Sequence, residues 1–370
     1  MKLFAWRSNA DAPLARTFSR LVEVVKRLVI ITVNYGTPKL TINCVESLAG
    51  ARASFDSLEA IVVDGGSNDN SALIIGEAIA APQFREWTEL IPLAINGGFA
   101  FANNRAFFAL AQRGELPELI ALINPDARIT PGALEAMAAL HEREPNAGAV
   151  GALLIHEDGR TQGSAFQFPT LLSEFCRGAR TGVINRILRQ PQQHIVATQA
   201  CQVPWVTGAA VMFKAAALKS AGLFDEGFFL YFEETELMWR MQKAGWQIWH
   251  EPAAKVIHAG GAATNIRDPE TGLPLPKRMP RYWYEARRRY FALVGGRSYA
   301  VGSGTAWILG HCIWQIRRLI GALPNDGVLR PAGDLAAFGL WPSKNSVVAA
   351  APDIASIASS EPFWMKNARQ

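Results

Sequence analysis

Runs of β-branched and aliphatic residues alternate with helical patterns through the first part of the chain. We expect strands at residues 27–34, 58–63, 89–93 and 119–123, and helices at residues 40–48, 72–80 and 102–113. Each strand-like run stops at residues that favour turns, and apolar positions then recur with helical spacing. Strands that alternate with helices predict a mostly parallel sheet covered by helices on both faces.

Beyond residue 148 the pattern is less regular. We expect strands at residues 149–156, 206–213, 247–250 and 254–258, and helices at residues 233–244 and 281–294. The organisation predicted from this pattern is an N-terminal extension at 1–27, one α/β domain at 28–295, an amphipathic, basic helical extension at 296–331 and a weakly structured tail at 332–370.

Composition narrows the class of protein. The chain has 370 residues, of which 49% are hydrophobic and 19% charged, so disordered and collagen-like classes are excluded. Four cysteines without CxxC spacing indicate neither a zinc ribbon nor a disulfide framework. Without a signal-peptide pattern or an apolar run of about 18 residues, we expect a cytoplasmic protein. The net charge of +5 permits contact with phosphates or anionic lipid.

Polar residues follow three of the predicted strands. Asp64, Asn96 and Asp126 fall where the strands end, and ligands of parallel sheets bind beyond these carboxyl ends. The loop at 64–71 suits a nucleotide or phosphate, and a capped turn explains it equally well. Asn124, Pro125 and Asp126 form either a simple turn or a ligand for a hard divalent cation. No GxGxxG follows the first strand, and no GxxxxGK[ST] occurs, so dehydrogenase and P-loop sites are not indicated.

The segment 222–237 combines an aromatic cluster with five carboxylates within twelve positions. Carboxylates held against aromatic surface have raised pKa values, which suits a general base. An acidic helix N-terminus would explain Glu233 and Glu234, but not their aromatic flank. His258 follows a predicted strand and is either a metal ligand or a structural histidine.

Two later segments carry arginines among aromatic residues. They are residues 281–289 and residues 306–320, the second with Trp307 and Trp314 followed by Arg317 and Arg318. Such segments suit an anionic diphosphate head group and a membrane interface. A core helix with a solvated basic face is the alternative.

Six segments, taken in order, resemble the inverting family-2 glycosyltransferases of GT-A fold, and more narrowly their bacterial rhamnosyltransferase-like branch. They are VIITVNYGTPKLTINCVESL, VVDGGSNDNS, NGGFAFANNRA, LINPDARITPGAL, FDEGFFLYFEETEL with WRMQKAGW, and EPAAKVIHAGG, and the resemblance covers about residues 28–289. The resemblance implies a GT-A (nucleotide-diphospho-sugar transferase) fold with a C-terminal helical extension. The third segment has Ala102 and Ala106 where the branch usually has glycine.

The resemblance also implies a dTDP- or UDP-sugar as donor. Asp64 would read the nucleobase, and the other donor-binding positions would be Val33, Asn34, Tyr35, Asn96, Gly98, Asn104, Asn124 and Asp126. Asp126 matches the last aspartate of the DxD-type metal element, whose first position here is Asn124. With His258 it implies Mg²⁺ or Mn²⁺, because oxygen-rich sites favour such hard ions.

Glu234 occupies the family's general-base position with a side chain one methylene longer, and Glu233 is the rival assignment. On the acceptor side, the implied residues are Trp205, Asp225, Arg281, Arg287 and Arg288. The base would deprotonate an acceptor hydroxyl as it attacks the anomeric carbon, and a single displacement inverts that centre.

The predicted function is transfer of rhamnose or a related hexose to a glycan or polyprenyl-diphosphate-linked acceptor in surface polysaccharide synthesis. The enzyme would work in the cytoplasm, at the inner face of the cell membrane where anionic lipid attracts its basic extension, and without nucleic acid. Three alternatives remain at this point: a catalytically silent nucleotide-sugar binder or scaffold, a transferase with a soluble or protein acceptor, and a nucleotidyltransferase.

Overall fold

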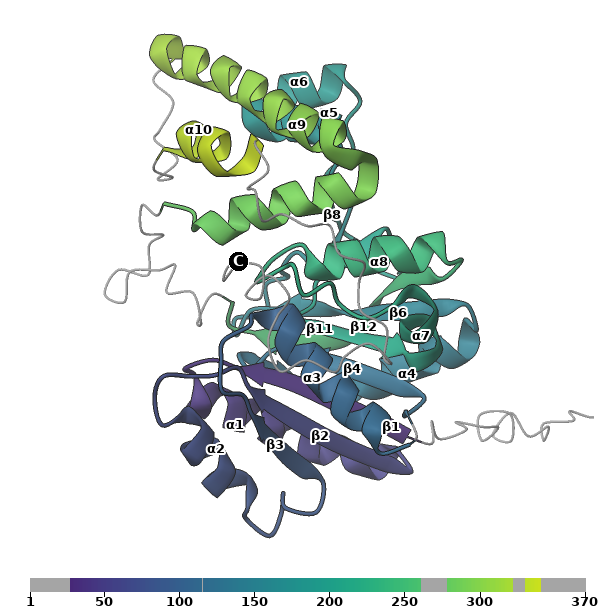
Figure 1. Cartoon of the computed structure of the whole chain (residues 1–370). Coiled ribbons are helices and arrows are strands. Elements are labelled where there is room, and N and C mark those ends of the chain that lie inside the picture. The colour runs from purple at the N-terminus through teal and green to yellow at the C-terminus, as the bar shows by residue number, and fades with distance from the viewer. Residues whose placement is uncertain (1–26, 115, 261–277, 322–329, 341–370) are drawn as a thin grey trace, which may run out of the picture.

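The structure is a computed structural model that describes residues 27–114, 116–260, 278–321 and 330–340 (Figure 1). Within these residues, nine strands form a central sheet in the order β3-β2-β1-β4-β11-β6-β12-β5, with β9 paired to β12. Their bounds are β1 Arg27–Asn34, β2 Ser57–Asp64, β3 Thr88–Pro92, β4 Leu119–Ile123, β5 Ala127–Ile129, β6 Ala147–Ile155, β9 Cys201–Gln202, β11 Ala210–Lys214 and β12 Gln247–His258.

The sheet is mixed. Strands β3, β2, β1 and β4 are parallel to one another, as are β6 and β12, whereas β11 is antiparallel to both β4 and β6, and β5 and β9 are antiparallel to β12. The register pairs Asn34 with Asp64, and Asp64 with Pro92. The carboxyl ends of β1, β2 and β3 therefore meet at one edge of the sheet.

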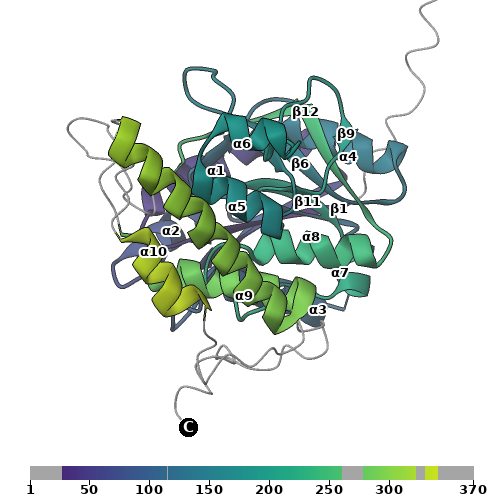
Figure 2. The same cartoon turned by 90° about the horizontal axis from the view of Figure 1, so that it is seen from above.

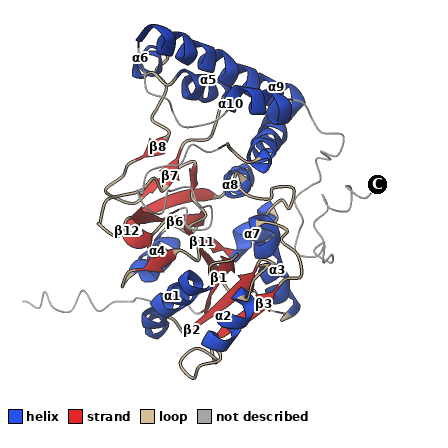
Figure 3. Cartoon of the chain, turned by 90° about the vertical axis from the view of Figure 1, so that its left-hand side faces the viewer, coloured by secondary structure: helices blue, strands red, loops and turns tan. Residues whose placement is uncertain are grey.

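Helices cover both faces of the sheet (Figure 3). Alternate residues of β1 face opposite sides: Leu28 and Ile30 pack with α1, α2 and α4, whereas Val29 and Ile31 pack with α3, α7 and α8. The bounds are α1 Pro38–Leu48, a 3-10 turn Ala49–Ser54, α2 Ser71–Ile79, α3 Phe99–Gln112, α4 Ala133–Arg143, α7 Ala215–Ala221 and α8 Glu233–Lys243. These helices confirm the α/β class with both faces buried.

Two predicted strand boundaries are wrong. Residues 206–213 are not one strand: β10 (Trp205–Val206) belongs to a separate antiparallel sheet, β10-β7-β8, with β7 at Ala165–Phe166 and β8 at His194–Ile195. Gly208 lies in the turn before β11 and leaves the Ala209 carbonyl to accept from the Asn124 amide (2.9 Å). Residues 247–258, expected as two strands, form the single strand β12. Its register shifts between Glu251 and Lys255, where Pro252 has no amide hydrogen to donate.

Above the sheet lies a helical module, formed by α5 (Leu171–Ala179), α6 (Gly182–Ile187), α9 (Arg281–Gly321), α10 (Pro331–Asp334) and a π-helical turn (Leu335–Leu340) (Figure 2). Helices α5 and α9 approach closely at two glycines. A Cβ on Gly178 would lie 2.2 Å from the Trp307 carbonyl oxygen, and one on Gly310 would lie 2.1 Å from the Phe175 carbonyl oxygen. Glycine at both positions allows the two backbones to touch.

The helical module differs from the organisation predicted for the C-terminal region. Helix α9 runs from the expected domain into the expected extension and kinks at Gly296 (φ 82°, ψ 177°), beside the predicted boundary at 295. Residues up to Leu340 are helical where a weakly structured tail was expected, because Leu335 is buried against Tyr284 and Trp307. The expected extension up to residue 26 and the tail from residue 341 lie outside the described residues. None of the helices that the structure describes is both long and apolar enough to cross a membrane.

Candidate active site

Asn34 and Asp64 form a fixed polar cluster at the ends of β1 and β2. The Asn34 amide nitrogen donates to Asp64 Oδ1 (2.7 Å), while Asn34 Oδ1 accepts from the Thr41 hydroxyl (2.8 Å). Ser67 donates through its backbone amide to Asp64 Oδ2 (3.0 Å) and through its hydroxyl to Oδ1 (2.7 Å). The Asp64 carboxylate is thus held in one orientation beside half-buried Val33 and exposed Tyr35.

The start of α3 is joined to the aromatic segment that precedes α8. Asn96 Oδ1 accepts from the Gly98 amide (3.0 Å), and the Phe99 amide donates to the Phe229 carbonyl (2.9 Å). Gly98 has φ 88°, and a Cβ there would lie 2.0 Å from the Phe229 carbonyl oxygen. Only glycine fits this contact, which fixes the Phe229 backbone near the sheet edge.

Asn104 has a different position from the one expected of a donor ligand. It is fully buried, and its amide donates to the Phe224 carbonyl (2.8 Å) and to Glu226 (3.0 Å), while its oxygen accepts from the Phe224 amide (3.2 Å). Arg105 also bonds Glu226 (2.6 Å). Asn104 therefore anchors the loop at 224–226, so any influence on the donor would pass through that loop.

Asp126 and His258, which are far apart in sequence, face one another: His258 Nε2 lies 3.3 Å from Asp126 Oδ1. Gln162 fixes the imidazole. Its amide nitrogen donates to the His258 carbonyl (2.6 Å), so its oxygen is the atom that faces His258 Nδ1 (3.0 Å) and accepts the Nδ1 proton. In the neutral imidazole, Nε2 then presents its lone pair toward the carboxylate.

This arrangement fits a shared cation. The Nε2 lone pair of His258 and the Asp126 carboxylate oxygen would repel each other unless a proton on Nε2 or a metal ion lies between them. A metal-bound histidine usually donates a hydrogen bond from its other ring nitrogen, as His258 Nδ1 does to Gln162. No cluster of three or more His, Cys, Asp or Glu residues suited to a metal occurs in the described part of the chain. Asp126 and His258 would accordingly supply two ligands, and substrate oxygens or water the others.

Glu233, which is buried, and Glu234, which is half-buried, begin α8, and the Oε2 atom of each is shielded from solvent without a hydrogen-bond partner among the described residues. Burial raises the pKa of Glu233 well above its ordinary value, and the neighbouring charge of Glu234 raises it further. Burial of its carboxylate also raises the pKa of Glu234. Hydrogen bonds from backbone amides, including that of Gly208, lower this pKa but offset only part of the increase. Two adjacent carboxylates whose pKa values are both raised favour sharing one proton over carrying two charges.

The backbone before this pair is strained. Tyr231 and Phe232 have φ values of 74° and 70°, in the left-handed region that bulky residues rarely adopt. Each such residue costs about 1–3 kcal/mol, and residues of this kind cluster at functional sites. By contrast, Glu236 in the same turn has an ordinary structural role, since it binds the Arg240 guanidinium at 2.8 and 2.9 Å.

One short segment connects the carboxylate pair to the sheet edge. A Cβ on Gly208 would lie 3.8 Å from the Glu234 Cβ and 3.7 Å from the Phe99 ring, so Gly208 packs between α8 and α3. The next residue, Ala209, accepts the bond from Asn124 noted above. The end of β4, the start of α3 and the first turn of α8 thus border one site.

Most of the expected acceptor residues have partners within the fold. Asp225 is buried and binds Arg289 through two bonds of 2.8 Å, and Arg287 is fully buried against Glu174. Arg288 donates to the Phe338 carbonyl (3.0 Å). Trp205 donates to the Gln167 carbonyl (2.9 Å) and stacks on a phenylalanine, and the largely exposed Arg281 pairs with Glu285.

Sequence reasoning missed Gln162 and the turn at Gly208. Gln162 lies in an irregular segment and reaches a histidine 96 residues away, so no local pattern marks it. Gly208 stood inside a run that resembled one strand, although a glycine within such a run is itself a signal of a break.

Comparison with known proteins gives the family of the chain. The family model described as Glycosyl transferase family 2 matches residues 28–221. N-acetylglucosaminyl-diphospho-decaprenol L-rhamnosyltransferase of Mycobacterium tuberculosis is 31% identical over 228 residues, which cover 58% of this chain and 70% of that protein; the sequences from strains CDC 1551 and H37Rv match equally.

Two solved structures also match the chain, with low identity. Mannosyltransferase PcManGT from Pyrobaculum calidifontis, in complex with GDP-Man and Mn²⁺, is 17% identical with a TM-score of 0.48, over 87% of this chain and 83% of that one. GalNAc-T7 with UDP, GalNAc and Mn²⁺ is 13% identical with a TM-score of 0.49, over 80% of this chain and 54% of that one. The family match and the identity to the rhamnosyltransferase, rather than these two likenesses, establish that the chain belongs to glycosyl transferase family 2 and is a glycosyltransferase of GT-A fold.

Proposed function

We propose that this glycosyltransferase moves rhamnose or a related hexose, with inversion, from a dTDP- or UDP-sugar to a polyprenyl-diphosphate-linked glycan in cell-surface polysaccharide synthesis. The relative from M. tuberculosis, whose name specifies a diphospho-decaprenol acceptor and rhamnosyl transfer, supports the acceptor class and the sugar. The observation that carries the proposal is the pair Glu233 and Glu234, whose Oε2 atoms are shielded from solvent and have no hydrogen-bond partner among the described residues, at the ends of the strands.

Glu234 serves as the general base. With the proton of the pair on Glu233, the Glu234 carboxylate would take the proton of an acceptor hydroxyl. As that proton moves to the Glu234 carboxylate, the acceptor oxygen attacks the anomeric carbon of the donor. The bond from that carbon to the diphosphate oxygen breaks, and the nucleoside diphosphate leaves from the opposite face. One displacement inverts the anomeric centre without a covalent enzyme intermediate.

Asp126 and His258 would hold a divalent cation. When bound, such a cation neutralises charge on the departing diphosphate. Because the set includes an imidazole nitrogen, we propose Mn²⁺ rather than Mg²⁺, which prefers oxygen ligands throughout. Asn124, beside Asp126, and the fixed cluster of Asn34 and Asp64 would position the donor, with Asp64 toward the nucleobase.

The exposed end of α9 would contact an anionic membrane surface. The tryptophans expected there, Trp307 and Trp314, are buried in the helical module. Instead, Leu319 and Ile320 are 85% and 82% exposed, next to Arg317 and Arg318. Apolar side chains beside arginines suit a membrane interface.

The test is nucleoside-diphosphate release from dTDP-, UDP- and GDP-sugars with Mn²⁺ or Mg²⁺, with and without a polyprenyl-diphosphate-linked glycan. We expect one donor to be favoured and its release to increase several-fold with acceptor. Release that only a soluble acceptor stimulates would replace the proposed acceptor. Tight donor binding without release under any condition would support the alternative of a silent nucleotide-sugar binder.

A further inference from the structure

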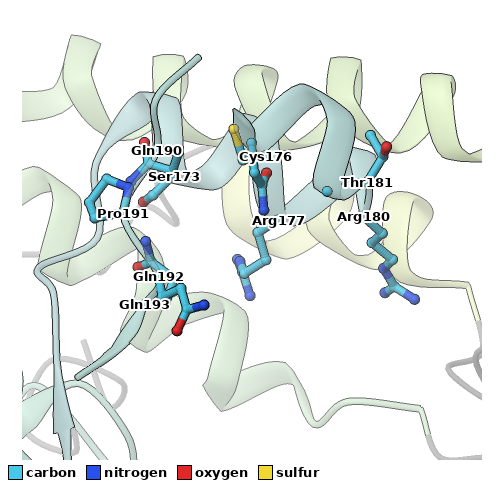
Figure 4. A pocket seen from close by; sticks show the side chains of 11 residues that line it. Ser173, Cys176, Arg177, Arg180, Thr181, Gln190, Pro191, Gln192 and Gln193 are labelled. Carbon is cyan, nitrogen blue, oxygen red and sulfur yellow. The ribbon is translucent and has the colours of Figure 1, made fainter. Parts of the chain in front are cut away.

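The helical module contains a polar pocket of about 470 Å³ between α5, α6 and the segment before β8 (Figure 4). Its lining is rich in groups that donate hydrogen bonds to anions or sugars. The lining residues are Ser173, Cys176, Arg177, Arg180, Thr181, Gly182, Asn185, Gln190, Pro191, Gln192 and Gln193. The volume lies within the range of small-ligand sites.

Positive charge exceeds negative charge at the wall of this pocket. Arg177, which lines the pocket, and Arg287, which lies behind the lining, both bind the carboxylate of Glu174, at 2.6 and 2.7 Å, so two guanidinium groups share one carboxylate. Arg180 lines the pocket as well, with its guanidinium 5.0 Å from the ring centre of Trp314. This wall therefore favours an anion.

Gln193 adds a second, independent observation. Its amide nitrogen is buried, and no hydrogen-bond acceptor for it occurs among the described residues. A buried donor without a partner costs about 1–3 kcal/mol, which a ligand oxygen in the pocket would recover. The pocket thus combines guanidinium groups with an amide donor that lacks an acceptor.

Two aromatic side chains connect the pocket to the catalytic carboxylates. The Arg177 guanidinium lies 5.4 Å from the ring centre of Trp283, and the Trp283 ring packs against Phe232 at 6.1 Å. Phe232 directly precedes Glu233. An acceptor with its reacting hydroxyl at Glu234 would therefore extend from α8 past this aromatic pair toward the pocket.

We propose that the pocket binds the diphosphate of a lipid-linked acceptor; this inference rests on the proposed function. Guanidinium groups bind phosphate oxygens through paired, charge-assisted hydrogen bonds, so Arg177 and Arg180 select a diphosphate over a neutral sugar. Helix α6 contributes Asn185 to the lining, while its Val183 and Ile187 are 64% and 72% exposed. These apolar side chains provide a surface for the lipid chain beside the diphosphate.

The test crosses two variants with two acceptors. The pocket variant carries Arg177→Gln and Arg180→Gln; the control carries Arg186→Gln and Arg189→Gln, which remove the same charge from exposed positions outside the lining. Each is assayed with a polyprenyl-diphosphate glycan and with a plain alkyl glycoside of the same sugar. We expect the pocket variant to raise KM for the diphosphate acceptor about tenfold to a hundredfold. Its kcat/KM with the glycoside, and the control variant with either acceptor, should match the unmodified enzyme.

Equal losses with both acceptors, or no loss with either, would overturn the proposed diphosphate site. The proposed function fails separately if the unmodified enzyme transfers to neither acceptor. The pocket is then tested by binding of inorganic pyrophosphate to protein whose donor site is saturated with nucleoside diphosphate. We expect the pocket variant to bind about tenfold more weakly than the control, and equal binding would again overturn the site.

Two single variants keep the proposal testable if the double variant does not fold. Arg180→Gln alone leaves the Glu174 ion pairs intact, and Arg177→Lys keeps a cation beside Glu174 but removes the planar, paired donors. Each should raise KM for the diphosphate acceptor by a smaller factor, with no change for the glycoside. If neither variant separates the two acceptors, the proposal is wrong.

Discussion

Two of the described helices begin with carboxylates that the fold largely shields from solvent, and the two sets have opposite chemistry. Glu174, in the first turn of α5, binds Arg177 and Arg287. Burial alone would raise its pKa, but the two guanidinium groups lower it overall. Glu233 and Glu234, in the first turn of α8, have no ion pair among the described residues, and burial raises the pKa of both. Burial is common to both sets, so the cationic partner decides whether such a carboxylate stabilises the fold or remains able to take a proton.

The largest effect should follow loss of the proposed base. Glu234→Gln keeps the size of the side chain but cannot accept a proton, so we expect kcat to fall about 10²- to 10⁴-fold. Glu233→Gln, the matched control, should lower kcat much less. Rates of nucleoside-diphosphate release with acceptor measure both. If Glu234→Gln kept full activity while Glu233→Gln abolished it, Glu233 would be the base.

The same substitution in α5 should act on stability instead. Glu174→Gln leaves Arg287, which is fully buried, without its charged partner. We expect the free energy of unfolding to drop by about 3–5 kcal/mol, as for other buried ion pairs that lose one member. Denaturant unfolding measures it, with Asp158→Asn in an exposed pair as the control, which should cost less than about 1 kcal/mol. A loss at Glu174 no larger than that of the control would contradict the comparison.

A third variant tests the support of the proposed metal site. Gln162→Leu removes the oxygen that accepts from His258 Nδ1, so the imidazole loses its fixed tautomer and orientation. Loss of such an outer partner typically weakens metal affinity about 10- to 100-fold. The Mn²⁺ concentration for half-maximal activity should rise accordingly, whereas Gln199→Leu, at an exposed position, should leave it unchanged. If the Mn²⁺ concentration for half-maximal activity of Gln162→Leu were unaltered, Gln162 would have no role in the metal site.

The raised pKa of Glu233 also predicts that Glu233→Gln is more stable than the unmodified protein at high pH. Because the folded protein holds a proton that the unfolded chain loses near its ordinary pKa of 4.5, stability falls as the pH rises above that value. Glu233→Gln cannot ionise, so near pH 8 it should be more stable than the unmodified protein. The gain is about 1.4 kcal/mol for each unit by which the pKa is raised. It should vanish near pH 4; a gain that persists there would have another cause.

The smallest effect concerns the exposed end of α9. Replacing both Leu319 and Ile320 with serine removes apolar surface but leaves Arg317 and Arg318, so binding to anionic vesicles should weaken about threefold to tenfold. Leu73→Ser, on α2, is the control because Leu73 is also well exposed. Vesicle co-sedimentation at low salt measures both. Equal binding by all three proteins would remove the proposed membrane contact.

The sequence predicted the sheet and the carboxylate pair for local reasons. Strands such as β1 and β4 are continuous apolar runs between turn residues, and Glu233 and Glu234 stand out against their aromatic neighbours. It failed where the partner is distant. Asp225 and Arg287 are charged, but their partners lie 64 and 113 residues away, so no local pattern indicates that these charges are paired within the fold. Gln162 was missed for the same reason, because its partner His258 lies 96 residues away.

The most direct test of the account is the pH dependence of nucleoside-diphosphate release with donor, Mn²⁺ and a polyprenyl-diphosphate glycan, for the unmodified enzyme and Glu234→Gln. We predict that the rate of the unmodified enzyme rises with pH through a pKa above the ordinary glutamate value of 4.5. Glu234→Gln should be at least about a hundredfold slower and should lack this rise. A Glu234→Gln enzyme with the rate and pH profile of the unmodified protein would contradict the central claim that the Glu234 carboxylate is the base.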